Sequence, residues 1–179
     1  MATLQLDENL IIRMAGHDGV AFRELYQQTS GVVYGFAMSI LRNKHDAEDV
    51  MHDAFIKIYQ SAVTYKPSGN PMAWILTIVR NLCLNRIRAG KVCEELSEYD
   101  DLAGASSDSD SVLDRMILET AMNILDAEER QIVVLHAMAG FKHREIAEVL
   151  DLPTGTILSK YNRALKKMRK EIETKEVEK

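Results

Sequence analysis

The sequence predicts an all-α protein made of two small helical domains joined by a flexible acidic linker. Apolar residues recur at helical spacing on both sides of the middle of the chain, and no run shows convincing strand alternation. The charge is also uneven: residues 1–92 hold ten Lys or Arg against eight Asp or Glu, residues 93–129 one against twelve, and residues 130–179 eleven against seven. The acidity therefore belongs to the middle of the chain, and both ends are mildly basic.

The linker is defined by its composition. Residues 94–111 are rich in Glu, Asp, Ser, Ala and Gly and contain no basic residue. Such a segment buries too little apolar surface to offset the entropy lost on ordering. We therefore expect a first domain at residues 1–92, a linker at 93–112 and a second domain at 113–179.

Four helices are expected in the first domain. Apolar stripes within 22–26 and 33–41 predict the first two helices, and a third is expected from about 46 to 62. The fourth helix begins with Asn70-Pro71, an N-cap followed by a proline at the first helical position, and ends before Gly90.

The second domain contains the pattern of a helix-turn-helix. Asp126 and Glu129 form a capping-box variant that opens a helix, and Gly140 closes it. Two further helices, at about 143–150 and 155–172, are joined by a tight turn with apolar residues placed to pack across it. This is the arrangement of a helix-turn-helix.

The polar face of the third helix suggests a protein-docking surface. Asp49, His52, Asp53 and Gln60 share this face with Ile56 in their midst. An apolar centre with a charged rim is typical of a small protein interface. The alternative is a solvated helix face with one stray apolar residue.

No catalytic or metal-binding pattern stands out. The chain lacks a P-loop, a Gly-x-Ser-x-Gly elbow and a dinucleotide fingerprint, so we expect a protein that is not an enzyme and has no cofactor. One cluster has metal-ligand spacing but no second helix supplies a matching Glu-x-x-His, so no metal is expected. The members of this cluster are His45, Asp49, His52 and Asp53. Cys83 and Cys93 match neither a zinc pattern nor a disulfide framework.

The outer face of the fourth helix combines aromatic, amide and guanidinium groups, with no acidic residue between Pro71 and Arg88. Such groups suit a nucleic-acid strand, because Arg binds phosphate, Asn contacts base edges and Trp stacks on bases. The alternative is that Trp74 packs at the rim of the core while the polar groups face water. The face consists of Trp74, Thr77, Arg80, Asn81, Leu84, Asn85 and Arg88.

The last helix has the composition of a DNA-recognition helix. Thr154 is expected to cap it, and its inward side is Ile157, Tyr161, Ala164 and Met168. A polar start followed by a basic tail suits base edges and then phosphates. The alternative is an amphipathic, Lys-rich surface helix. The outward residues are Thr156, Ser159, Lys160, Arg163, Lys167 and Lys170.

With these motifs in place, the chain resembles the extracytoplasmic-function (ECF) sigma factors, the small bacterial sigma factors that keep only sigma domains 2 and 4. The resemblance covers roughly residues 17–91 and 113–171. It depends on Asp46-Ala47-Glu48-Asp49-Val50 with Ala54-Phe55, on Ala73-Trp74-Ile75 and Arg80-Asn81-Leu82, and on Arg144-Glu145-Ile146-Ala147-Glu148 through Gly155-Thr156-Ile157 to Arg163-Ala164.

The resemblance implies a transcription initiation factor with three contact surfaces. Core RNA polymerase would bind Asp46, Glu48, Asp49, His52, Asp53 and Ile56. The single-stranded −10 element would be captured and opened by Ser68, Gly69, Asn70, Trp74, Thr77, Arg80, Asn81, Asn85 and Arg88. The double-stranded −35 element would be contacted by Arg144, Thr154, Gly155, Thr156, Ser159, Lys160, Arg163, Lys166, Lys167 and Lys170.

The resemblance also implies partners. The protein would act as a monomer on the polymerase, its acidic linker would lie in channels built for nucleic acid, and an anti-sigma factor would mask its surfaces. No apolar run is long enough for a membrane span and no signal-peptide pattern is present, so a cytoplasmic location is expected. The rival hypotheses are a conventional helix-turn-helix regulator with a sensing or dimerising domain, and a helical metalloenzyme.

Three positions depart from the family pattern. Lys142 stands where the family commonly has a capping Ser or Thr, and Leu158 stands where a Lys is frequent. Asp151 replaces the usual turn glycine, but Asp tolerates a left-handed conformation. These departures affect the expected −35 sequence and not the fold.

Overall fold

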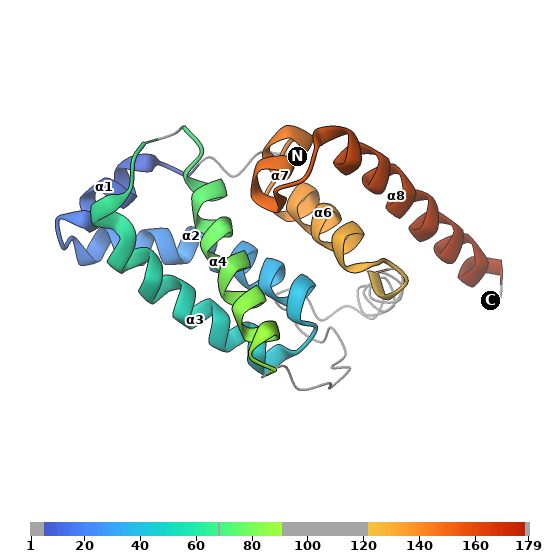
Figure 1. Cartoon of the computed structure of the whole chain (residues 1–179), viewed down its shortest axis with the longest axis horizontal. Helices are drawn as coiled ribbons and strands as arrows, with labels where there is room; N and C mark the ends of the chain where they lie inside the picture. The colour runs from blue at the N-terminus through green and yellow to red at the C-terminus, as the bar shows by residue number, and fades with distance from the viewer. Residues whose placement is uncertain (1–5, 68, 91–121, 178–179) are drawn as a thin grey trace.

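The computed structural model describes residues 6–67, 69–90 and 122–177, and within these ranges all regular structure is helical (Figure 1). The elements are α1 (Glu8–Ala15), α2 (Gly19–Leu41), α3 (Lys44–Ser61), the 3₁₀ helix η1 (Ala62–Thr64), α4 (Pro71–Arg88), α6 (Ala127–Met138), α7 (His143–Leu150) and α8 (Thr154–Val177). The all-α prediction is confirmed. The predicted linker at 93–112 and the predicted site residue Ser68 lie outside the described residues.

The first half of the N-terminal domain differs from the sequence-based expectation. The stripes at 22–26 and 33–41 belong to the single helix α2 and not to two helices. The polar stretch between them remains helical, and within it the Thr29 hydroxyl donates to the Leu25 carbonyl at 2.7 Å. Asp18 is the cap of α2, and its side chain accepts from the backbone N–H groups of Val20 and Ala21.

Helix α1 was not predicted. Asp7 caps it, accepting from the Asn9 N–H, and it buries Leu10, Ile11 and Met14 against the domain core. Its Asp7 cap and its apolar positions are local signals in the sequence that could have predicted it.

Helix α4 follows the predicted boundaries. The Asn70 side chain accepts from the Ala73 N–H at 3.1 Å, and Pro71 is the first helical residue. Gly90, just past the end of the helix, has φ +64°, a conformation that glycine adopts without strain.

The C-terminal domain confirms the predicted helix-turn-helix. The Asp126–Glu129 capping box forms, with the Glu129 N–H donating to Asp126 at 2.8 Å. Asp151 ends α7 with φ 55°, the left-handed conformation expected in place of a turn glycine. Helix α8 begins at Thr154, and the Pro153 carbonyl accepts from the N–H groups of residues 156 and 157. The prediction that Thr154 is the cap was therefore wrong by one residue.

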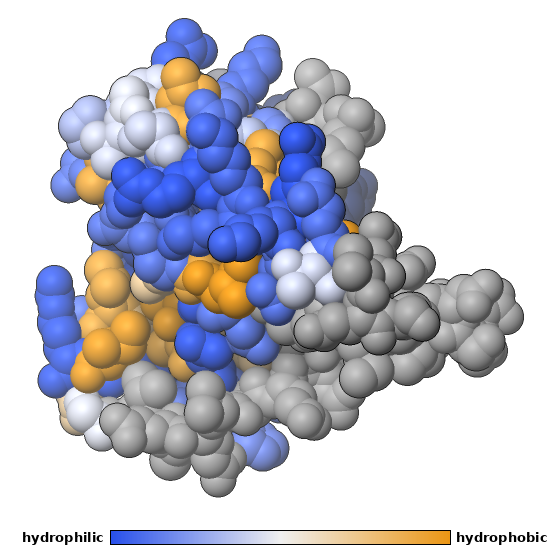
Figure 2. Space-filling view, turned by 90° about the vertical axis from the view of Figure 1, so that its right-hand side faces the viewer, coloured by the Kyte–Doolittle hydropathy of each residue, from blue (hydrophilic) through white to orange (hydrophobic). Residues whose placement is uncertain are grey.

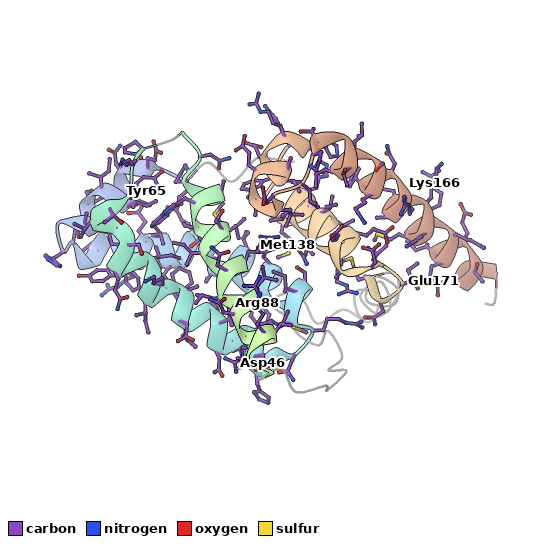
Figure 3. The ribbon with its side chains drawn as sticks, viewed as in Figure 1. Asp46, Tyr65, Arg88, Met138, Lys166 and Glu171 are labelled. Carbon is purple, nitrogen blue, oxygen red and sulfur yellow. The ribbon has the colours of Figure 1, made fainter. Side chains whose placement is uncertain are left out.

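The two domains pack against each other, which the sequence did not predict. Helix α6 lies along α2, and α7 lies beside α4 (Figure 1). One cluster of buried apolar side chains runs from the N-terminal domain into α6 and α7. Arg130 of α6 is only 3% exposed, and its guanidinium donates to the Ser39 carbonyl of α2 at 3.2 Å. Figure 3 shows Met138 of α6 between the two domains.

The outer side of the C-terminal domain is mostly polar. Figure 2, viewed from the end at which α8 runs out, shows a broad hydrophilic band with hydrophobic residues confined to patches beside it. Among the described residues, no helix is both long and apolar enough to span a membrane.

Candidate polymerase and nucleic-acid interfaces

The polar face of α3 is exposed as predicted. Ile56 is 58% exposed, and Asp49, His52 and Asp53 are exposed on the same helix. Ala54 and Phe55 are buried on the opposite side. The arrangement is an apolar centre with a charged rim, available to a protein partner.

Asp46 is the exception among the predicted polymerase-binding residues. Its side chain is buried and accepts from Nε of Arg86 at 2.6 Å, and Nη2 of Arg86 also donates to Asp49 at 2.8 Å. Asp46 therefore connects α3 to α4 inside the domain, and the expectation that it lies on the docking surface was wrong. In Figure 3, Asp46 lies at the end of the α3–α4 pair where α4 finishes.

Arg86 was not singled out from the sequence. Burial disfavours its charge, but its hydrogen bonds to Asp49 and Asp46 outweigh this and raise the pKa of Arg86. A pairing between residues 40 positions apart leaves no signal in helical periodicity, so sequence reasoning could not find it.

The outer face of α4 is largely exposed. Thr77, Asn81, Asn85 and Arg88 face solvent. Trp74 is half-buried, with its ring centroid 4.7 Å from that of Tyr65. The packing is the one that the alternative predicts, because Trp74 lies at the rim of the core with an exposed portion beside the polar groups. Nucleic-acid binding by this face stays a prediction.

Arg80 lies where the two domains meet. It is partly buried, and its Nη2 donates to the carbonyl of Leu150 at the end of α7, at 3.1 Å. Asn70 also reaches the helix-turn-helix, with Nδ2 3.4 Å from Oε1 of Glu145. Two of the predicted −10 residues thus contact the domain predicted to bind the −35 element.

The segment before α4 is held by a residue that the sequence did not single out. Oε1 of Glu8, on α1, accepts from the Gly69 N–H at 3.0 Å and from the Tyr65 hydroxyl at 2.5 Å. Gly69 has φ +77° and is exposed. Figure 3 shows Tyr65 between α1 and the start of α4.

Most of the predicted −35 residues present an exposed surface. These are Arg144 on α7 and Thr154, Gly155, Ser159, Arg163, Lys166 and Lys170 on α8, with Thr156 partly exposed. Ile157 and Ala164 are fully buried on the inner side, as expected. The Ser159 hydroxyl donates to the Thr156 carbonyl at 2.9 Å, and Lys166 points away from the rest of the molecule (Figure 3).

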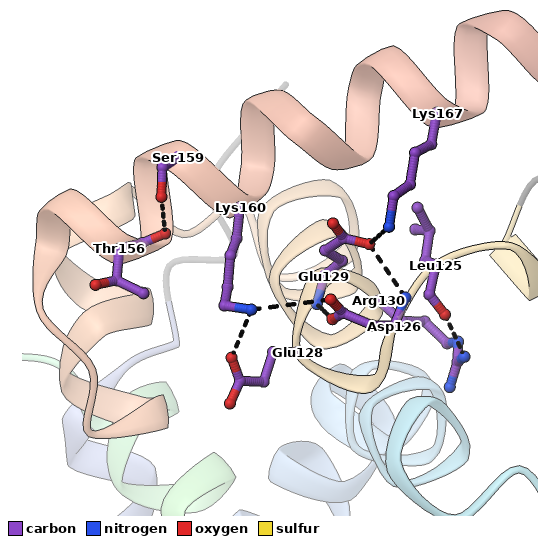
Figure 4. A network of polar contacts seen from close by, with 9 residues as sticks. All are labelled: Leu125, Asp126, Glu128, Glu129, Arg130, Thr156, Ser159, Lys160 and Lys167. Carbon is purple, nitrogen blue, oxygen red and sulfur yellow. Dashed lines mark hydrogen bonds and ion pairs between the residues drawn. The ribbon is translucent and has the colours of Figure 1, made fainter.

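Two lysines of α8 do not face outward, contrary to expectation. Nζ of Lys160 lies 2.9 Å from Glu128, and Nζ of Lys167 lies 2.6 Å from Oε2 of Glu129, both on α6 (Figure 4). The hydrogen bond to Glu128 raises the pKa of Lys160, and the nearby charge of Asp126 adds to the effect. These lysines lie on the side of α8 that faces α6, so their charges are already paired with carboxylates of α6.

Over the described ranges, no group of three or more His, Cys, Asp or Glu side chains is arranged to hold a metal ion. The candidate cluster of His45, Asp49, His52 and Asp53 is therefore not a preformed site, and Asp49 is instead paired with Arg86.

A polar, acid-free helix face in one domain and a helix-turn-helix with an exposed basic face in the other define a two-domain, helical DNA-binding protein. The family model for Sigma-70 region 2 matches residues 25–92, and the model for Sigma-70 region 4 matches residues 115–168. Together the two matches cover more than half of the chain. The chain belongs to the sigma-70 family of RNA polymerase sigma factors, in its ECF class, and is a transcription initiation factor that directs the polymerase to promoters.

Curated relatives carry the same class name. The ECF RNA polymerase sigma factor SigK of Mycobacterium tuberculosis is 27% identical over 168 residues, covering 89% of this chain and 90% of that protein. SigK of Mycobacterium sp. strain KMS is 28% identical over 159 residues, covering 84% of this chain and 82% of the relative.

Two solved structures have a similar fold. CnrH, in complex with the cytosolic domain of CnrY, matches with a TM-score of 0.67 at 20% identity, covering 94% of this chain and 97% of that chain. The sigma factor RpoE of Bartonella quintana, in complex with the anti-sigma factor NepR, matches with a TM-score of 0.67 at 22% identity, covering 85% and 96%. At these identities the likeness establishes the fold.

Proposed function

We propose that three surfaces divide the work of promoter recognition. The α3 face around Ile56 docks on core polymerase, the α4 face captures the unpaired −10 strand, and the start of α8 contacts base edges of the −35 duplex. The observation that supports this division best is that each surface remains exposed after its helix has buried its apolar side.

The −35 contacts follow from the geometry of α8. Ser159 and Arg163 are about one helical turn apart on the exposed side, near the end of the helix that enters the major groove in helix-turn-helix proteins. Lys166 and Lys170 lie further along, where such a helix leaves the groove and its cations bind phosphates. Lys160 and Lys167 of α8 instead pair with Glu128 and Glu129 of α6, so these two lysines attach α8 to α6 and are not proposed to contact DNA.

The −10 contacts follow from the chemistry of α4. Unpaired bases need a stacking partner and edge contacts, and Trp74, Asn81 and Asn85 supply these with Arg88 available for phosphate. A surface without acidic side chains avoids repelling the strand.

The protein performs no chemistry of its own, and it acts in the cytoplasm, where the polymerase is. A dedicated anti-sigma factor is its proposed regulator. The two similar structures are complexes whose partners are named as CnrY and the anti-sigma factor NepR, which supports such a partner here.

The docking surface is tested by Ile56→Glu in a binding assay with core polymerase. We expect weaker binding with unchanged thermal stability, because Ile56 is exposed. Val63→Glu is the matched control, because Val63 is also exposed and lies just beyond α3. A loss of several kcal/mol of stability in Ile56→Glu would mean that Ile56 supports the core.

A further inference from the structure

Glu8 joins two parts of the chain that are far apart in the sequence. Its Oε1 accepts from the backbone N–H of Gly69 at 3.0 Å and from the hydroxyl of Tyr65 at 2.5 Å. Short bonds to a carboxylate are the charge-assisted kind, which are stronger than bonds between neutral groups. Helix α1 is thereby attached to the segment that leads into α4.

Both bonds restrain groups next to the proposed −10 surface. The Tyr65 ring packs against Trp74, with ring centroids 4.7 Å apart and planes at 59°. Gly69 precedes Asn70, the N-cap of α4, and has a left-handed backbone with φ +77°. A glycine in open surroundings has many accessible conformations, so a hydrogen bond to its N–H restricts the turn considerably.

We infer that Glu8 is a positioning residue for promoter opening. It fixes the Gly69 turn and the Tyr65–Trp74 pair, so that the α4 face is already ordered when it meets the unpaired −10 strand. The inference rests on the proposed role of α4. Glu8 does not itself contact DNA, since its carboxylate faces the protein groups that it holds. Ordering these groups before the strand arrives lowers the entropy cost of binding it.

The first arm of the test needs neither DNA nor polymerase. Trp74 is the only tryptophan of the chain, so its fluorescence reports the position of Tyr65 and the adjacent turn. Glu8→Ala should raise the acrylamide quenching constant of Trp74 by about twofold, because the Tyr65 hydroxyl and the Gly69 N–H lose their bonds to the carboxylate and the Tyr65–Trp74 pair is held less firmly. Glu8→Gln should stay near the wild type, because the amide oxygen still accepts. Glu24→Ala is the matched control, an exposed glutamate on α2 that is hydrogen-bonded to Gln28.

Unchanged quenching in Glu8→Ala, with a circular dichroism spectrum like that of the wild type, would overturn the positioning role. If Glu8→Ala fails to fold, Glu8→Gln takes its place, because the amide should preserve the hydrogen-bond geometry. Quenching of Trp74 in Glu8→Gln as strong as in the unfolded chain would then also overturn the positioning role.

The second arm measures opening of the −10 region by permanganate reactivity in the polymerase complex. Glu8→Ala should lower thymine reactivity about tenfold, equivalent to about 1.4 kcal/mol, with closed-complex occupancy unchanged. Glu8→Gln should restore most of it, and Glu24→Ala should have no effect. Asn81→Ala runs in parallel as the direct test of the α4 face.

The two hypotheses fail differently. If Asn81→Ala lowers reactivity and Glu8→Ala does not, α4 receives the strand and the positioning role is wrong. If neither variant lowers it, α4 is not the −10 surface and the positioning role falls with it.

Discussion

The ammonium group of Lys167 on α8 lies 2.6 Å from Oε2 of Glu129 on α6, a residue that is completely buried. The same carboxylate accepts from the Asp126 N–H at 3.1 Å and so completes the capping box of α6 (Figure 4). A buried carboxylate needs a cation nearby, because an isolated charge in the interior is costly. Lys167 therefore supports the attachment of the recognition helix to α6.

Lys167→Ala and its neighbour Lys166→Ala should consequently behave differently. Lys167→Ala should lower the free energy of unfolding by about 2 kcal/mol, because Glu129 loses a charged hydrogen-bond partner. Lys166→Ala should change stability by less than about 0.5 kcal/mol, as is usual for an exposed residue. Urea unfolding measures both.

Lys166→Ala and Lys167→Ala should also differ in their effect on DNA binding. Lys166→Ala should make the salt dependence of promoter binding shallower by about one unit, because one phosphate contact is lost. Lys167→Ala should leave this slope unchanged. A shallower slope in Lys167→Ala would mean that Lys167 contacts phosphate in the complex.

Removal of Arg86 should destabilise the N-terminal domain. Arg86→Ala leaves the buried Asp46 carboxylate without its cation, at a cost of about 3 kcal/mol. Arg88→Ala, two residues along and exposed, is the control and should change stability by less than about 0.5 kcal/mol. Equal thermal shifts in the two variants would contradict a structural role for the Arg86–Asp46 pair.

Cys83 should be chemically inert in the folded protein. It is fully buried, and burial raises the pKa of its thiol to about 12. In a Cys93→Ser background, labelling by a thiol reagent at pH 8 should require unfolding of the domain and accelerate with urea. Fast labelling of native protein would show that Cys83 is accessible.

The pH dependence of stability follows from the same pKa. The thiol is neutral in the folded protein up to about pH 12 but ionises in the unfolded chain near pH 9. Its contribution to stability is therefore complete below pH 9 and decreases as the pH rises towards 12. The difference in unfolding free energy between wild type and Cys83→Ala, measured from pH 8 to 10, should follow this direction.

The proposed −10 and −35 contacts require the packed arrangement of the two domains to open on the polymerase. Arg80 bonds to the Leu150 carbonyl, and Leu150 is at most about 15 Å from Thr154, since consecutive Cα atoms are 3.8 Å apart. By the positions in their names the −35 and −10 elements are about 25 base pairs apart, which at about 3.4 Å per base pair is roughly 85 Å of B-DNA. The closed form cannot contact both.

Fluorescent labels at Gln60→Cys and Asn162→Cys, in a Cys93→Ser background, would measure this opening, because both positions are exposed and lie in different domains. Energy transfer between the labels should fall when core polymerase is added. Unchanged transfer in the polymerase complex would mean that the domains remain packed while promoter DNA is bound.

Local signals predicted the fold well. Caps such as Asn70 and Asp126 act within one turn of their helix, so the residues that determine them are neighbours in the sequence. The left-handed turn at Asp151 was predictable for the same reason. Helix α1 was missed although its Asp7 cap is a local signal, and α2 was divided in two because a polar stretch need not interrupt a helix.

Contacts between distant residues could not be predicted. A helical period groups Lys160 and Lys167 with the outward residues of α8, but it does not reveal which flank α6 covers. The family resemblance placed Asp46 among the polymerase-binding residues, and the sequence does not reveal that Arg86, on another helix, pairs with it inside the domain. The packing of the two domains and the bonds of Glu8 depend on tertiary structure in the same way.

The most direct test of the account is transcription by core polymerase from a promoter library with both the −35 and −10 elements randomised. Arg163→Ala should relax sequence preference at one −35 position, because an arginine bidentate to guanine contributes about 1–3 kcal/mol of discrimination. Asn81→Ala should relax preference only within the −10 element. The assignment of the two surfaces is contradicted if Arg163→Ala instead lowers transcription from every promoter equally. It is also contradicted if either variant changes the sequence preference within the other element.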